Sequence, residues 1–145
     1  MTFSRKTTVH WKGSIMEGAG SAEAGSGAFT LPVTFPRRIG EPEGSTSPEE
    51  LIAAAHATCF AMVIAGAIGR NNATADRFDV TCTVSAEKGD AGIRIANSRL
   101  DLTVHGLKGL EADAFEKIAR EAEQKCPVSN ALRLALTIEV SVSVK

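Results

Sequence analysis

The alternation of hydrophobic and polar residues predicts several strands. Residues 78–87 (FDVTCTVSAE) alternate regularly, and residues 93–107 resume the alternation after the turn sequence KGDAG, so these two segments are expected to form a hairpin. Residues 134–144, at the end of the chain, place an apolar side chain at nearly every second position, which indicates a strand with one buried face. A looser alternation around Val9 and Trp11 predicts another strand in the first dozen residues.

A long apolar segment, residues 51–68 (LIAAAHATCFAMVIAGAI), predicts a central helix. Its start is well marked, because Ser47 is a favourable N-cap, Pro48 suits the first helical position and Glu50 completes a capping-box pattern. We expect this helix to begin at Pro48 and to end near Gly69.

A second helix is predicted over residues 110–125, where apolar residues recur at helical spacing. The pair Cys126-Pro127 breaks it, and a short helix over residues 128–134 is expected to follow.

The segment before the central helix has weaker signals. Residues 13–30 are rich in Gly, Ala and Ser, and fit either a flexible connection or a pair of weak strands. The proline-rich segment that follows predicts a loop with one short strand from Val33 to Phe35. The order of strands, helix, hairpin, helices and strand predicts one α+β domain over residues 1–145, with antiparallel sheets around a long buried helix.

Size and composition favour a soluble cytoplasmic domain. The chain has 145 residues, 43% hydrophobic and 23% charged, with a net charge of -1, so no strong field favours a nucleic-acid or membrane partner. The N-terminus has no apolar signal segment. The apolar segment 51–68 is rich in alanine and contains His56, which favours a core helix over a membrane span. Because this helix is apolar on nearly every face, we expect a homodimer to bury it.

The three cysteines are odd in number and far apart, which is typical of a reducing compartment. Cys82 is in phase with its strand's apolar face and is expected in the core. Cys59 lies in the central helix one turn after His56, which either packs beside the thiol or lowers its pKa. Cys126 is placed as N-cap of the short helix, where backbone N–H groups would favour its thiolate; the alternative is a purely structural helix end.

Other catalytic chemistries have little support in the sequence. His10, His56 and His105 are scattered, and no zinc-type spacing of His or Cys occurs. Neither a phosphate-binding glycine loop nor a G-x-S-x-G nucleophile motif is present. We therefore expect no metal and no cofactor.

Two segments resemble a known family. Residues 45–62 (STSPEELIAAAHATCFAM) and residues 125–132 (KCPVSNAL) are similar to the OsmC/Ohr family of organic hydroperoxide reductases, and closer to its OsmC branch. The HWKG segment near the N-terminus, the DAG turn and the final strand extend the resemblance over essentially the whole chain. It implies an intertwined homodimer in which antiparallel sheets surround the central helix, with active sites at the interface.

The resemblance also implies a catalytic set. Cys59 matches the peroxidatic cysteine, Cys126 the resolving cysteine and Glu49 the catalytic glutamate. The family's arginine matches Arg38, with Arg37 as the alternative. The implied reaction reduces organic hydroperoxides through a Cys59 sulfenic acid and a Cys59–Cys126 disulfide, which a dithiol reductant, of lipoyl type by resemblance, reopens. The implied setting is oxidative and osmotic stress.

The chemistry of these residue types is consistent with that scheme. A buried thiol resists ionisation, so a guanidinium is needed beside it, and a carboxylate such as Glu49 can orient the arginine. Ten residues of straight helix span about 15 Å, so Glu49 is expected to reach the Cys59 of the partner subunit. Apolar walls that include Phe60 and Met62 predict a preference for organic hydroperoxides over hydrogen peroxide.

Two other functions fit the same sequence. One is a non-catalytic thiol sensor or small-molecule-binding module on this fold, which would form the disulfide slowly. The other is a structural dimer whose cysteines are inert. Thiol loss on addition of stoichiometric peroxide separates the three, because only the peroxidase should lose two thiols within seconds.

Overall fold

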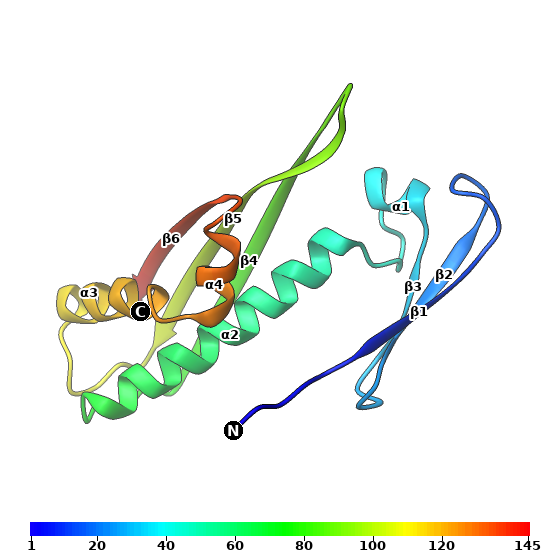
Figure 1. Cartoon of the computed structure of the whole chain (residues 1–145). Coiled ribbons are helices and arrows are strands. Elements are labelled where there is room, and N and C mark those ends of the chain that lie inside the picture. Colours follow the sequence, from blue (N-terminus) through cyan, green and yellow to red (C-terminus); the bar gives the residue numbers. More distant parts are fainter. The chain divides into compact units, whose positions relative to one another are not determined.

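The structure is a computed structural model that describes residues 1–145 (Figure 1). The chain forms two compact units, Met1–Leu51 and Ile52–Lys145, and each is described by itself.

The first unit contains a three-stranded antiparallel sheet in the order β1-β2-β3. Strand β1 is Thr7–Lys12, β2 is Ala19–Ala24 and β3 is Thr30–Val33. The strand predicted around Val9 and Trp11 is confirmed. Of the two interpretations of residues 13–30, the structure supports strand over flexible connection, but with one strand, β2, in place of the expected pair; β2 pairs with both of its neighbours along the chain.

A short helix follows where a loop and strand were expected. Helix α1, Phe35–Ile39, begins after Thr34, whose Oγ1 accepts a hydrogen bond from the Arg37 N–H at 3.3 Å. Pro36 lies in its first turn, where a missing N–H costs nothing. The predicted strand from Val33 to Phe35 is wrong, because the strand ends at Val33 and this N-cap starts a helix two residues later.

Helix α2, Pro48–Arg70, ends one residue beyond the predicted terminus. Its N-cap is as expected, because Ser47 Oγ accepts a hydrogen bond from the Glu50 N–H at 3.1 Å. By length and composition α2 could also cross a membrane, since an 18-residue stretch of it has a mean hydropathy of 2.1, a property that core helices of soluble proteins share.

Within the single chain, α2 is buried on one side only, and its full burial by a second copy stays an expectation. One face is buried in the core: His56, Phe60, Ile64, Ala67 and Ile68. The opposite face is an exposed apolar stripe, defined as Ala54, Ala55, Thr58, Met62 and Ala65. The reason is geometric: the elements packed on α2 within one chain cover only one of its sides.

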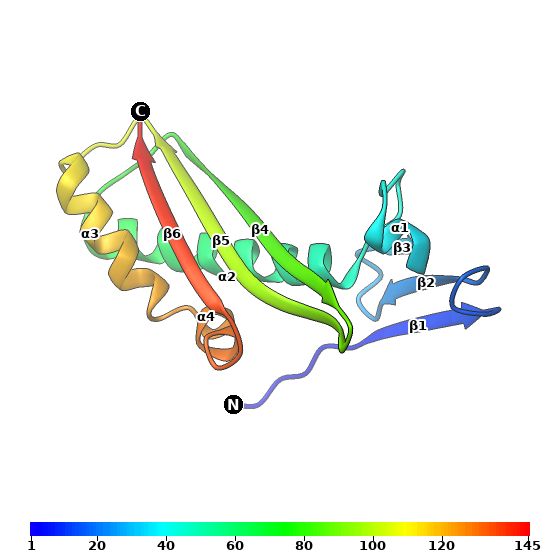
Figure 2. The same cartoon turned by 90° about the horizontal axis from the view of Figure 1, so that it is seen from above.

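The second unit contains a three-stranded sheet in the order β4-β5-β6. Strands β4, Arg77–Gly89, and β5, Gly92–His105, form the predicted antiparallel hairpin. Strand β6, Thr137–Val144, runs parallel to β5 (Figure 2), which corrects the expectation of a purely antiparallel sheet. The helices between β5 and β6 form a crossover that returns the chain to the starting end of β5, and such a connection produces a parallel neighbour.

The crossover contains α3, Ala112–Glu123, and α4, Pro127–Leu132, close to their predicted ranges. Helix α2 crosses one face of the sheet, and α3 lies alongside β6 (Figures 1 and 2). The apolar sides of these helices meet the inner face of β5 in one core, to which the largest contributors are Phe60, Ile64, Leu100, Leu102 and Phe115.

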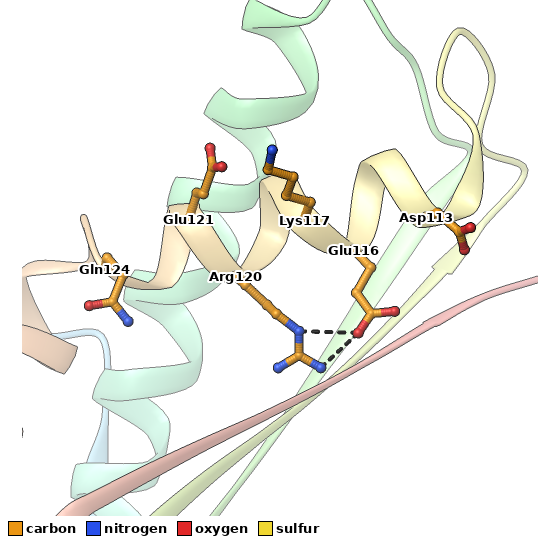
Figure 3. Close-up of a pocket in the computed structure, with 6 residues that line it drawn as sticks. All are labelled: Asp113, Glu116, Lys117, Arg120, Glu121 and Gln124. Atoms are coloured by element: carbon orange, nitrogen blue, oxygen red, sulfur yellow. Dashed lines mark hydrogen bonds and ion pairs between the residues drawn. The ribbon is translucent and has the colours of Figure 1, made fainter.

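The other side of α3 is charged and faces solvent. Figure 3 shows Glu116 and Arg120 bonded to each other on the side of β6, while Lys117 and Glu121 point the other way. Arg120 Nη1 also donates to the Val140 carbonyl oxygen at 3.1 Å, which attaches α3 to β6. The charged side of α3 therefore helps to hold the crossover against β6.

Candidate active site

The two cysteines predicted to act together meet in the fold. The sulfur of Cys59, on α2, lies 3.1 Å from the sulfur of Cys126, although 67 positions separate them in the chain. Both are free thiols, and Cys126 is fully buried at the start of α4. Because a disulfide bond is about 2.05 Å long, a shift of about 1 Å would join the two sulfurs.

The environment of Cys59 opposes its ionisation within one chain. Burial raises the pKa of the Cys59 thiol, and the neighbouring Cys126 raises this pKa further. The backbone N–H of Val128, in the first turn of α4, donates to the Cys59 sulfur and acts in the opposite direction. A nucleophilic Cys59 therefore requires a positive group from elsewhere.

The structure corrects the expected cap role of Cys126. Cys126 is the N-cap residue of α4, but its side chain makes no capping hydrogen bond. Its sulfur turns to Cys59 and donates to it, and the Val128 N–H of the same helix start is directed at Cys59.

His56 makes a buried hydrogen-bond network. Its Nδ1 lies 2.7 Å from Ser98 Oγ on β5, and its Nε2 lies 2.7 Å from Ser129 Oγ on α4. All three side chains are fully buried. Burial lowers the pKa of His56, which favours the neutral ring that donates at one nitrogen and accepts at the other. Since both nitrogens are bonded to serines, no hydrogen bond from His56 activates the Cys59 thiol.

The third cysteine lies beside this network. Cys82 packs against the core, as predicted, and its sulfur lies 3.3 Å from Ser98 Oγ. Burial raises the pKa of the Cys82 thiol, so the protonated form is favoured. Cys82 thus behaves as a small, half-buried side chain at the edge of the network, with a second, weaker contact of 3.9 Å to His56 Nδ1.

The predicted arginine and glutamate form an ion pair in the first unit. Arg38 Nη2 donates to Glu49 Oε1 at 2.6 Å, and Arg38 Nε donates to both carboxylate oxygens at 3.2 and 3.1 Å. The hydrogen bond from Arg38 lowers the pKa of Glu49. Arg37 instead pairs with Glu43. The four predicted residues thus form two pairs: Arg38 with Glu49 in the first unit, and Cys59 with Cys126 in the second.

The segment that carries Cys126 is held by contacts that sequence reasoning missed. Arg133 Nη2 donates to Glu123 Oε1 at 2.6 Å, and Gln124 Nε2 donates to Glu123 Oε2 at 2.7 Å. Glu123 is almost completely buried. One signal for it is present in the sequence, because Glu123 follows Ala119 by four residues on the apolar side of α3.

The residues expected to line the substrate site differ in their exposure. Phe60 is fully buried in the core, whereas 69% of Met62 is exposed on the apolar stripe of α2. Phe60 is therefore a core residue in the single chain, which corrects its expected place in the wall of the site. Met62 remains available to contact a ligand or a second protein surface.

The fold and the two adjacent thiols define an α+β protein with a pair of cysteines close enough to form a disulfide. Comparisons with known proteins identify its family. The chain belongs to the OsmC family: the family model described as OsmC-like protein matches residues 40–141. Peroxiredoxin OsmC of Escherichia coli K12 is 38% identical over 140 residues, which are 96% of each chain.

Solved structures agree with this assignment. An organic hydroperoxide resistance protein OsmC from Legionella pneumophila superposes with a TM-score of 0.74 and 27% identity, over 95% of this chain and 96% of that one. The organic hydroperoxide resistance protein OhrB of Bacillus subtilis superposes with a TM-score of 0.73 over 95% of this chain and 98% of that one; at 21% identity this likeness shows the shared fold.

Proposed function

We propose that this protein is a cysteine-based peroxidase that reduces organic hydroperoxides to alcohols, with Cys59 as the attacking thiol and Cys126 as the resolving thiol. The observation that carries the proposal is the 3.1 Å separation of these two sulfurs in a chain of the OsmC family. The relatives named peroxiredoxin and organic hydroperoxide resistance protein support the same activity.

The reaction has three balanced steps. The Cys59 thiolate attacks one peroxide oxygen, the O–O bond breaks, and an alcohol leaves after taking up a proton, so Cys59 becomes a sulfenic acid. Cys126 then attacks the Cys59 sulfur; a disulfide forms and water leaves. An external dithiol, such as a lipoyl-type one, reopens the bridge by thiol–disulfide exchange and is itself oxidised to a disulfide.

Arg38 supplies the positive charge that Cys59 needs, and Glu49 orients it. The support is physical: burial raises the pKa of the Cys59 thiol, and the bonds between Arg38 and Glu49 fix the direction of the guanidinium. Helix α2 is continuous, so ten residues of rise separate Glu49 from the Cys59 of the same chain by about 15 Å. The Arg38–Glu49 pair therefore serves the Cys59 of a partner subunit.

A homodimer is the assembly that completes this site. The exposed apolar stripe of α2 belongs to a helix with an 18-residue stretch of mean hydropathy 2.1, and Cys59 follows Thr58 of that stripe directly. Association of two copies would remove this face from water and bring each subunit's Arg38 to the other's thiol pair. Sedimentation should give the mass of two chains at micromolar concentration, and a stable monomer would contradict the assembly.

The experiment that tests the activity is a thiol titration. Wild-type protein should lose two thiols per chain to one equivalent of cumene hydroperoxide within seconds. Cys59→Ser should lose none, whereas Cys126→Ser should react once and then overoxidise with excess peroxide. Cys82→Ser is the matched control and should behave as wild type, because its sulfur contacts Ser98 and not the thiol pair. Retention of both thiols by the wild type would refute the proposal.

The substrate class follows from the apolar stripe. Where the partner subunit leaves part of this stripe open beside Cys59, an organic hydroperoxide gains burial energy against Met62 and the neighbouring alanines, and hydrogen peroxide does not. The value of kcat/KM should therefore be higher for cumene hydroperoxide than for hydrogen peroxide. Equal values would contradict this part of the proposal.

A slow thiol sensor is the second candidate, favoured by the raised pKa of Cys59 in the single chain. The same titration separates the two, since a sensor would lose its thiols over minutes. We further infer that residues 1–145 act as one functional domain, soluble in the cytoplasm, with a role in oxidative or osmotic stress. The similarity to Peroxiredoxin OsmC of Escherichia coli, which extends over 96% of this chain, supports the single domain.

A further inference from the structure

The hydrogen bond between His56 and Ser129 joins the two helices that carry the thiol pair. We propose that His56 is a positioning residue that, through Ser129, holds Cys126 within bonding reach of Cys59. This inference rests on the proposed function, because it assigns His56 to the step that closes the disulfide.

His56 and Ser129 each lie three residues from one of the two cysteines. His56 precedes Cys59 by three residues on α2, and Ser129 follows Cys126 by three residues at the start of α4. The bond from Nε2 to Oγ, 2.7 Å long, and the 3.1 Å sulfur contact therefore join the same two elements about one turn apart. Fixing the first contact restricts the geometry of the second.

The ring of His56 is held in place by hydrogen bonds at both of its nitrogens. Nδ1 bonds Ser98 Oγ at 2.7 Å on β5, so the imidazole is anchored to the sheet on one side and presents Nε2 to α4 on the other. All three side chains are fully buried. A buried polar pair of this kind has one satisfied arrangement, and any displacement of α4 leaves two polar groups unpaired.

The other polar contacts of the Cys126 segment lie within that segment. Arg133 bonds Glu123, and Asn130 Nδ2 donates to the Gln124 carbonyl oxygen at 3.1 Å. These bonds shape the segment between Glu123 and Arg133, but they do not attach it to α2. Among side-chain hydrogen bonds, attachment to α2 comes from His56–Ser129 and from the sulfurs themselves.

The chemical consequence concerns the rate and equilibrium of ring closure. A resolving thiol held near its target has a high effective concentration, which falls when the thiol samples other positions. Loss of the Ser129 hydroxyl releases the start of α4, whereas loss of the Ser98 hydroxyl releases the ring from the sheet and leaves its bond to α4. The two serines are therefore a matched pair: both are fully buried, and both lie 2.7 Å from the same ring.

The first experiment measures the Cys59–Cys126 disulfide in reduced and oxidised glutathione buffers and requires no peroxide. The effective concentration of Cys126 should fall about tenfold in Ser129→Ala, the scale of one lost buried hydrogen bond. It should fall by a clearly smaller factor in Ser98→Ala, which loosens the ring but keeps its bond to Ser129, although both variants lose similar thermal stability. Equal effective concentrations in the two variants would overturn the inference.

A second pair of variants checks the same point at the histidine. The amide of His56→Gln reaches the place of Nε2 and can bond Ser129, whereas the shorter His56→Asn reaches the place of Nδ1 and bonds Ser98. In stopped-flow reactions with cumene hydroperoxide, sulfenic acid formation should be alike in both. Disulfide closure should be faster in His56→Gln, and closure at the same rate in both would refute a positioning role.

The two experiments distinguish the failure of either idea. Wild type that forms the disulfide in glutathione buffer but ignores peroxide would refute the proposed activity, and the serine pair would still report on positioning. Wild type that reacts with peroxide while the serine variants match each other would refute the positioning role alone.

Discussion

The ion pair between Arg133 and Glu123 offers a sharp test of how the Cys126 segment is held. Replacing Arg133 by Met removes the guanidinium that donates to Glu123 Oε1 at 2.6 Å and leaves a carboxylate that is only 4% exposed. Breaking a fully buried pair costs about 3–5 kcal/mol. Arg133 itself is 38% exposed, so solvent screens part of this interaction. Because Gln124 still donates to Glu123, we expect a loss of about 2 kcal/mol in the free energy of unfolding.

The assay is urea unfolding followed by circular dichroism at constant protein concentration. For a chain of this size, a loss of about 2 kcal/mol corresponds to a decrease of about 4–8 °C in Tm. The matched control is Arg94→Met, since Arg94 bonds Glu87 at a similar 2.7 Å but both side chains are mostly exposed, at 67% and 68%. The control should lose less than about 1 kcal/mol. If the two variants lost the same stability, burial of Glu123 would not be the source of the effect.

The remaining predictions concern pH, assembly and catalysis. Burial lowers the pKa of His56, so at acidic pH the unfolded chain binds a proton there that the folded chain does not. The free energy of unfolding should therefore fall as the pH drops below about 6.5. Urea midpoints measured across this pH range should show a smaller fall in His56→Gln. Met62→Lys places a charge on the exposed stripe of α2 and should shift sedimentation from dimer to monomer; an unchanged dimer would contradict the interface. Glu49→Gln weakens the bonds that orient Arg38 and should lower kcat/KM for cumene hydroperoxide about tenfold or more, the effect of raising a thiol pKa by about one unit, while Glu43→Gln, at the pair of Arg37, should leave kcat/KM unchanged.

Much of the local structure could be predicted because its causes lie within a few residues. Alternating side chains identified β4, β5 and β6, and the capping residue Ser47 located the start of α2. The start of α1 was also local, at Thr34 and Pro36, but a segment rich in proline was interpreted as a loop. The orientation of β6 was not local: it depends on the end of the sheet to which the crossover of α3 and α4 returns the chain.

The candidate site divides in the same way. The resemblance identified Cys59, Cys126, Glu49 and Arg38 as site residues. Their positions in the sequence do not say how far apart they lie in the folded chain. The folded structure shows that the sulfurs of Cys59 and Cys126, 67 positions apart in the chain, are in contact. It also supplies the choice of Arg38 over Arg37 as the partner of Glu49, because α1 turns only one of two adjacent side chains toward that carboxylate.

By itself, then, the sequence determined most of the elements, the α+β class and the residue types capable of thiol chemistry, since periodicity and capping act over one or two turns. Only the tertiary structure decided what His56 does. A histidine one turn before a cysteine fits activation of the thiol equally well from the sequence, and the two serines that occupy its nitrogens come from a strand and a helix 42 and 73 positions away. Hydrogen bonds of a buried ring are chosen by the groups that packing brings within about 3 Å, and packing joins positions that no local pattern relates.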